Sequence, residues 1–123
     1  MHELAVCQSL IRETEKVAEK HGARRVTRLV VAIGPLSGVE APLLERAFEI
    51  ARFGTVADGA VLEIETMPVT VWCGDCEAES VVPANALLCD RCGTWKVSVR
   101  SGDELLLKRL ELAPDEAPAD MAV

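Results

Sequence analysis

The fold of this chain is decided by residues 73–92, CGDCEAESVVPANALLCDRC, which hold two Cys-x-x-Cys pairs. Each pair lets two sulfur atoms from one tight turn reach the same ion, and two pairs complete the tetrahedral shell that zinc prefers. Because this shell has no open position, we predict a structural zinc site with the ligands Cys73, Cys76, Cys89 and Cys92. A redox dithiol pair or an iron–sulfur cluster would need a thioredoxin-like surrounding or a third pair, and the sequence has neither.

The segments on either side of this module predict one domain of helices and strands. Residues 4–21 carry an apolar stripe at helical spacing and end at Gly22, and residues 39–53 predict a second helix. Apolar, β-branched runs predict strands at residues 25–33, 61–65 and 105–112. The last strand needs a sheet to join, and the two earlier strands are its best partners. We therefore predict a domain whose final strand returns after a zinc module inserted at about 70–99.

Shorter signals give more local expectations. Ser37 and Glu40 have the spacing of a helix capping box, although Pro42 favours a helix start one or two residues later. Residues 69–72 and 95–99 are strand-like. Residues 113–123 combine alanine, proline and acidic side chains, which predicts a disordered acidic tail.

Three side chains outside the zinc ligands carry their own predictions. Cys7 lies on the apolar stripe of the first helix, so we expect a buried thiol that acts as a small apolar residue. Trp72 and Trp95 flank the cysteine module symmetrically and are expected to cover its small core, although tryptophan is also favoured at interfaces.

Composition and charge exclude several classes of function. The chain has 123 residues and a formal net charge of −7, which opposes binding to nucleic-acid phosphates. It lacks an apolar run of about 18 residues and a signal peptide, so we expect no membrane partner and a cytoplasmic location. It also lacks a Ser/His/Asp set, a phosphate-binding loop and an open metal site with a base, so no enzymatic activity is predicted.

The first three residues, Met1-His2-Glu3, form a second candidate metal site. The α-amine, the amide nitrogen of His2 and its imidazole can bind one metal ion as fused chelate rings. The amide nitrogen of Glu3 can complete the square. Four nitrogen ligands in a plane suit Ni(II) or Cu(II) rather than tetrahedral zinc. Taken alone, a histidine at position 2 is most often an exposed side chain at a frayed terminus.

The start MHELAVCQSLI, together with the downstream cysteine pairs, resembles the hydrogenase nickel-incorporation proteins of the HypA/HybF family. The resemblance covers roughly residues 1–112. It also includes the segments His21-Gly22, Arg25–Gly34, Leu36–Glu40, Ala47-Phe48 and Gly102–Glu111. It implies an α+β fold of two helices on a three-stranded sheet with an inserted zinc-ribbon-like domain that holds the four cysteines. The nickel-binding domain would be residues 1–69 plus 100–112, and the zinc-binding domain residues 70–99.

The resemblance also implies a nickel metallochaperone that delivers Ni(II) for maturation of [NiFe]-hydrogenase. Its nickel ligands map onto the amine of Met1, His2 and Glu3. Glu40 aligns with a position that assists nickel, although a carboxylate there also suits a helix N-terminus. The four cysteines map onto the zinc ligands.

The partners that the resemblance implies are a nickel-binding maturation GTPase and the hydrogenase large subunit, and some relatives also serve urease. We expect a monomer or a weak homodimer. The alternative function is a zinc-ribbon protein–protein adaptor without a nickel role.

Overall fold

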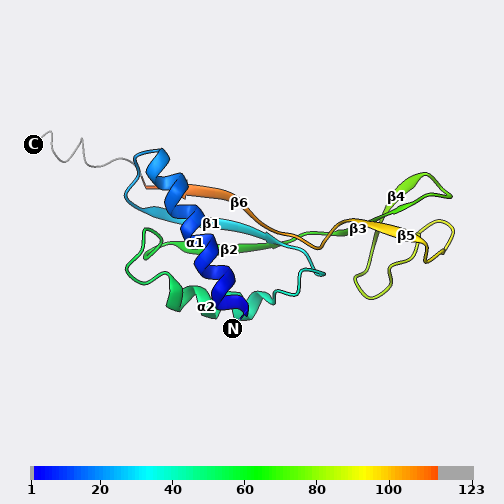
Figure 1. Ribbon diagram of the computed structural model, residues 1–123, viewed down its shortest axis with the longest axis horizontal. Helices are drawn as coiled ribbons and strands as arrows, with labels where there is room; N and C mark the ends of the chain where they lie inside the picture. Colours follow the sequence, from blue (N-terminus) through cyan, green and yellow to red (C-terminus); the bar gives the residue numbers. More distant parts are fainter. Residues whose placement is uncertain (1, 114–123) are drawn as a thin grey trace, which may run out of the picture. The chain divides into compact units, whose positions relative to one another are not determined.

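The computed structural model describes residues 2–113, in which two helices and six strands are present (Figure 1). In chain order they are α1 (His2–Lys20), β1 (Val26–Ile33), α2 (Ala41–Ala51), β2 (Val61–Thr66), β3 (Val69–Cys73), β4 (Ala78–Val82), β5 (Val97–Ser101) and β6 (Leu105–Leu112). The strands form two three-stranded sheets with the orders β2-β1-β6 and β4-β3-β5. The predicted fold class is confirmed, and β6 returns to β1 after the cysteine module as expected.

Two compact units make up the chain. The first, called here the helix unit, holds the described residues of Met1–Val31, Glu40–Glu63 and Leu107–Val123. The second, called here the cysteine unit, holds Ala32–Val39 and Ile64–Leu106. The predicted acidic tail lies outside the described residues except for Ala113, whose N–H donates to the carbonyl of Arg25 at 3.0 Å. Over residues 2–113, neither helix has the length and apolar character that a bilayer crossing requires.

The core of the helix unit is aliphatic because α1 and α2 pack their apolar stripes together (Figure 1). Cys7, Leu29, Leu44 and Phe48 are among its fully buried side chains, each with at most 1% of its surface exposed. The thiol of Cys7 donates a hydrogen bond to the carbonyl of Leu44 at 3.4 Å, which joins α1 to α2. Desolvation raises the pKa of Cys7 to about 11, so the thiol stays protonated. The prediction of a buried Cys7 is confirmed.

Strand β1 is central in its sheet, which explains its nearly continuous apolar sequence. Its one charged side chain, Arg28, lies between the two edge strands. The guanidinium of Arg28 binds the carboxylate of Glu63 on β2 at 2.9 Å and that of Glu111 on β6 at 3.3 Å. These ion pairs are partly exposed, so they contribute little to the free energy of unfolding. They link the central strand to both of its neighbours.

The helix boundaries differ from the predicted ones at both N-termini. Helix α1 begins at His2, two residues before the predicted start at residue 4. Of the two alternatives left open for α2, the later start favoured by Pro42 is the observed one, at Ala41. The capping box does not form: the hydroxyl of Ser37 accepts the N–H of Val39 at 3.2 Å, and Glu40 is the N-cap of α2 without a side-chain hydrogen bond. Pro42 lies in the first turn of α2, where its missing N–H would have had no partner in any case.

The cysteine unit has a small core on one face of its sheet. Val69, Val71 and Val82 are buried there, and Leu36, Leu87 and Val97 pack against them. Strand β4 was not among the predicted strands because its five residues lie between the cysteine pairs and give little periodic signal. Pairing with β3, from Val69 opposite Val82 to Cys73 opposite Ala78, forms this strand. Strand β5 begins at Val97, two residues after the start of the predicted segment 95–99.

Two glycines allow a close backbone crossing in the cysteine unit. A Cβ atom on Gly34 would lie 2.2 Å from the carbonyl carbon and oxygen of Gly102. Gly102 has a φ of +109°, and its own Cβ would lie 2.8 Å from Cα of Val69. Hydrogen bonds hold this crossing: Gly34 N–H donates to the carbonyl of Glu104 at 2.8 Å, and Leu36 N–H donates to that of Gly102 at 2.7 Å. Side chains are therefore sterically excluded at both positions.

The substitution Gly34→Ala is predicted to destabilise the protein by ~3 kcal/mol or more, because the new methyl group would meet backbone rather than a movable side chain. Urea unfolding followed by circular dichroism measures the change. Gly59→Ala is the matched control, since nothing lies within 4 Å of a Cβ there. A loss for Gly34→Ala no larger than that of the control would contradict the crossing.

Candidate metal centre

Four cysteine sulfurs converge in the cysteine unit. The Sγ atoms of Cys73, Cys76, Cys89 and Cys92 all lie within 4.8 Å of one another. The Sγ atoms of Cys73 and Cys92 are 3.8 Å apart, and those of Cys76 and Cys89 are 3.7 Å apart. Four sulfurs that each lie about 2.3 Å from a central zinc form a tetrahedron with edges of about 3.8 Å. A disulfide would need about 2.05 Å. The spacing therefore fits one tetrahedral ion.

The two cysteine pairs have the same local geometry. In each pair, the N–H of the second cysteine donates to the sulfur of the first at 3.4 Å, from Cys76 to Cys73 and from Cys92 to Cys89. The residue that follows each pair has a positive φ, 52° for Glu77 and 76° for Gly93. This left-handed residue reverses the chain, so that the first pair forms the turn between β3 and β4.

The charges of the sulfurs explain why a cation is needed. Hydrogen bonds from the backbone N–H groups of Cys92 and Arg91 lower the pKa of Cys89 to about 6. Hydrogen bonding to the side chains of Cys89 and then Cys92 raises the pKa of Cys76 to about 12. One thiolate thus forms readily, and hydrogen bonding between the sulfurs keeps the thiol of Cys76 protonated. A divalent cation removes this difference, and zinc takes four thiolates.

Neither tryptophan covers the core of the cysteine unit. Trp95 is 73% exposed, and the ammonium group of Lys96 lies 5.9 Å from its ring centroid, so the prediction that it covers the core is wrong. Trp72 is half-buried on β3, with the guanidinium of Arg100 at 5.3 Å from its ring. Trp72 alternates with Val71 and Cys73 along β3, so it faces away from the valine core, and the prediction that it covers this core is also wrong. The core consists of Val69, Val71 and Val82 with Leu36, Leu87 and Val97 packed against them.

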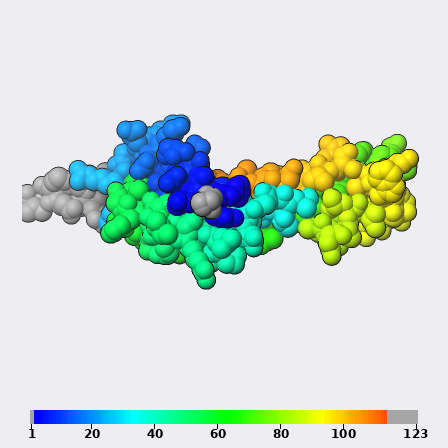
Figure 2. All heavy atoms as spheres, turned by 60° about the horizontal axis from the view of Figure 1, so that its bottom comes forward, coloured from blue at the N-terminus to red at the C-terminus, as the bar shows by residue number. Residues whose placement is uncertain are grey.

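The N-terminal candidate site lies at the start of α1. His2 is exposed and Glu3 is half-buried in the first turn, and Figure 2 shows this end of α1 in dark blue at the surface beside α2. The first four N–H groups of a helix have no acceptor within the helix, and the amides of His2 and Glu3 are among them. Within residues 2–113, Glu40 does not form a group of three metal-ligating side chains with His2 and Glu3.

Sequence reasoning found the four cysteines but missed the atoms that organise them. The N–H groups of Arg91 and Cys92 that donate to Cys89 come from backbone conformation, which residue type alone does not specify. Gly93 could have been predicted at its left-handed position, whereas Glu77 could not, because glutamate rarely adopts this conformation.

Two helices on a sheet with a closed four-cysteine site define a small metal-binding protein whose metal is structural. Residues 1–112 match the family model described as "Hydrogenase/urease nickel incorporation, metallochaperone, hypA", and the chain belongs to this HypA family of nickel metallochaperones.

Relatives match along nearly their whole length. The hydrogenase maturation factor HypA of Nitrosospira multiformis is 48% identical over 112 residues, which cover 91% of this chain and 97% of that protein. The HypA of Aquifex aeolicus is 43% identical over 115 residues, covering 94% of this chain and 100% of the relative. The solution structure of the Ni metallochaperone HypA from Helicobacter pylori superposes with a TM-score of 0.71 at 32% identity, covering 92% of this chain and 98% of that one.

The substitution Cys73→Ser is predicted to reduce zinc content from one ion per chain to nearly none, because three thiolates leave the tetrahedral shell incomplete. Zinc is measured by inductively coupled plasma mass spectrometry on protein purified in zinc-containing medium. Cys7→Ala is the matched control, since it removes the one cysteine outside the cluster. Full zinc content in Cys73→Ser, or loss of zinc in Cys7→Ala, would contradict the assignment.

Proposed function

We propose that this chain binds Ni(II) at its N-terminus and delivers it for maturation of [NiFe]-hydrogenase. A zinc ion held by Cys73, Cys76, Cys89 and Cys92 stabilises the cysteine module. The observation that carries the proposal is an exposed His2 at the first position of α1, in a chain that belongs to a nickel metallochaperone family. The nickel ligands are the amine of Met1, the amide and imidazole nitrogens of His2 and the amide nitrogen of Glu3.

The helix start supports this ligand set energetically. Deprotonated amides of His2 and Glu3 would cost α1 no internal hydrogen bond, because the first N–H groups of a helix have no internal acceptor. The positive end of the helix dipole also stabilises negative charge there, on the amide nitrogens and on the Glu3 carboxylate. Glu40, the exposed N-cap of α2, assists nickel through its carboxylate in this proposal.

The two metals are kept apart by their ligands. Soft thiolates in a tetrahedron favour zinc, whereas nitrogen ligands in a plane favour Ni(II). The cysteine site is closed by four protein ligands, which suits a metal that stays. A site at the chain end is open to a second protein, whose ligands can replace those of the chaperone one at a time. In this proposal the protein therefore binds Ni(II) and transfers it to a partner protein, without catalysing a reaction.

Membership of the family makes the chain a hydrogenase maturation factor, which acts together with other maturation components. We propose that these are a nickel-binding GTPase and the hydrogenase large subunit, and that they meet the chain in the cytoplasm. Residues 1–69 with 100–112 form the nickel-binding domain in this proposal, and residues 70–99 form the zinc-binding domain.

Extending the chain by two residues before Met1 is predicted to weaken Ni(II) binding strongly while leaving zinc content at one ion. The extension converts the α-amine into an amide and moves His2 away from the terminus. Loss of an outer-shell partner alone costs about 10- to 100-fold in metal affinity, so loss of a ligand should cost at least as much. Isothermal titration with Ni(II) measures the effect.

The substitution His2→Ala in the unextended chain is the companion variant and should lose specific nickel binding as well. His21→Ala is its control: that side chain is also exposed, and its Nδ1 lies 2.9 Å from the carbonyl of Val17 at the other end of α1. Equal nickel affinity in the extended and unextended chains would remove the amine from the ligand set. Zinc without specific nickel in the unmodified chain would leave a zinc-bearing adaptor.

A further inference from the structure

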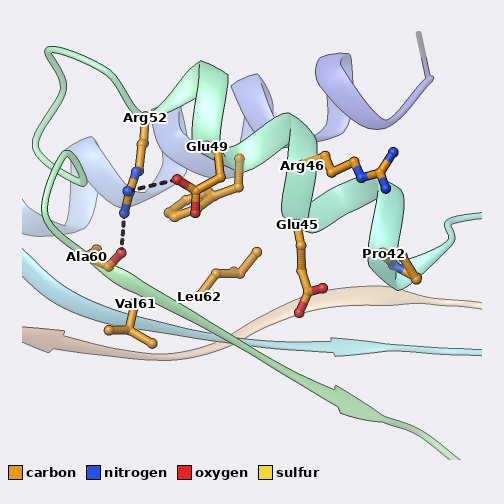
Figure 3. Close-up of a pocket in the computed structure, with 9 residues that line it drawn as sticks. Pro42, Glu45, Arg46, Glu49, Arg52, Ala60, Val61 and Leu62 are labelled. Atoms are coloured by element: carbon orange, nitrogen blue, oxygen red, sulfur yellow. Dashed lines mark hydrogen bonds and ion pairs between the residues drawn. The ribbon is translucent and has the colours of Figure 1, made fainter.

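In a groove of about 620 Å³ between α2 and the start of β2, the guanidinium of Arg52 is already engaged. Its Nη1 donates to the carbonyl of Ala60 at 2.8 Å, and its Nη2 binds the carboxylate of Glu49 at 2.9 Å (Figure 3). This guanidinium therefore has little capacity left for a ligand. The cysteine cluster differs from the groove, because one of its four ligand residues is exposed.

The four zinc ligands are buried to different degrees. Cys73 and Cys89 are only 1% and 4% exposed, whereas Cys76 is half-buried and Cys92 is exposed. Each close sulfur contact joins a buried cysteine to a less buried one: Cys73 to Cys92 at 3.8 Å, and Cys89 to Cys76 at 3.7 Å. The cluster therefore has an inner side, made by Cys73 and Cys89, and an outer side, on which Cys92 is the more exposed residue.

Both inner ligands are fixed by their backbone. Cys73 ends the central strand β3, which pairs with β4 on one side and with β5 on the other. The N–H of Cys89 donates to the carbonyl of Thr94 at 2.9 Å, and the carbonyl of Cys89 accepts the N–H of Gly93 at 2.9 Å. A reagent in solution reaches these two sulfurs only if the paired backbone around them moves.

The surroundings of Cys92 are open. It lies at the end of the turn formed by residues 90–92, and all of residues 90–93 are exposed. The next residue, Gly93, has no side chain, and apart from its chain neighbours no atom lies within 4 Å of the position that a Cβ would take there. The residue that follows Cys92 therefore does not shield it from solvent.

Hydrogen bonds to sulfur do not separate Cys92 from the inner ligand Cys73. The sulfur of Cys73 accepts the N–H of Cys76 at 3.4 Å, and the sulfur of Cys92 accepts the N–H of Thr94. Zinc also holds all four ligands as thiolates. The reactivity of a cysteine depends on its thiolate character and on its access to the reagent. Because zinc makes the first factor equal, exposure decides which sulfur reacts.

We propose that Cys92 is the ligand at which soft electrophiles modify the zinc site, and that this modification releases the zinc. Alkylation by iodoacetamide is the simplest case: a sulfur–carbon bond forms, the carbon–iodine bond breaks, and iodide leaves with the electron pair. The product is a neutral thioether, whereas zinc is bound by the thiolate form of cysteine. The proposal rests on the assignment of zinc to the four cysteines and does not depend on nickel binding.

The test treats the full, zinc-loaded chain with iodoacetamide at low conversion and identifies the modified residues by mass spectrometry of tryptic peptides. Iodoacetamide is neutral, so the charges around the cluster do not select the site. Trypsin cleaves after Arg91, which places Cys92 on the peptide 92–96 and the other three ligands on the peptide 53–91. Zinc release is followed in parallel with a chromogenic chelator.

We expect Cys92 to be modified at least about tenfold more often than Cys73 or Cys89, because access decides between thiolates. Zinc should be released at the rate at which Cys92 is modified. Cys7 is the internal control: it is fully buried and lies outside the cluster, so it should stay unmodified.

The substitutions Cys92→Ser and Cys73→Ser form a matched pair. At the exposed position water can take the fourth place on zinc, as in sites with three protein ligands, whereas the buried position gives water no such access. Cys92→Ser should therefore bind zinc at least about tenfold more tightly than Cys73→Ser in competition with a chelator.

Equal modification of the four ligands, faster modification of any ligand other than Cys92, or zinc release that precedes modification of Cys92 would overturn the proposal. Equal zinc affinity of the two serine variants would also overturn it. Absence of zinc from the unmodified chain would overturn the zinc assignment together with this proposal, so the two failures are distinguishable.

Discussion

Four sulfur atoms that lie within 4.8 Å of one another cannot all carry negative charge unless a cation lies among them. This constraint organises the cysteine unit. Without the ion, hydrogen bonds lower the pKa of Cys89 and raise that of Cys76, so the two sulfurs differ in charge. Structural zinc in small peptides is bound with about 10–16 kcal/mol at neutral pH, comparable to the whole stability of a domain. A three-valine core could not hold these loops as firmly.

One strand, β3, joins the metal site to the backbone crossing within this unit. Strand β3 begins at Val69, which lies under Gly102, and ends at Cys73, the first sulfur of the cluster. The same strand thus carries the core, the first metal ligand and the close contact that excludes side chains from Gly34 and Gly102. A rigid strand of five residues explains how so small a module positions its first cysteine turn.

The N-terminus differs from the closed cysteine site because it lies at the exposed start of a helix. The nickel ligands proposed for it belong to the first residues of a helix, whose N–H groups have no acceptor within the helix, and the imidazole of His2 is exposed. Cys7, further along the same helix, ties α1 to α2 through its bond to the carbonyl of Leu44, so the helix behind the site is held firmly. An open end on a fixed helix suits a metal that must be passed on, whereas the closed sulfur cluster suits one that must stay.

The sequence predicted most of this fold because its strongest signals are local. The apolar stripe of α1 around Cys7, the apolar run of β1 and the Cys-x-x-Cys spacing are each patterns within one short stretch of sequence. What it did not predict depends on tertiary contacts: β4 forms through pairing with β3, and Trp95 is exposed because valines and leucines form the core.

The central claim is that nickel and zinc occupy different sites made of different ligand atoms. X-ray absorption at the nickel and zinc edges of one doubly loaded, unextended sample tests it most directly. The account predicts nickel bound by four nitrogen atoms in a plane, without sulfur, and zinc bound by four sulfurs at about 2.3 Å. Sulfur in the nickel shell, or fewer than four sulfurs around zinc, would contradict it.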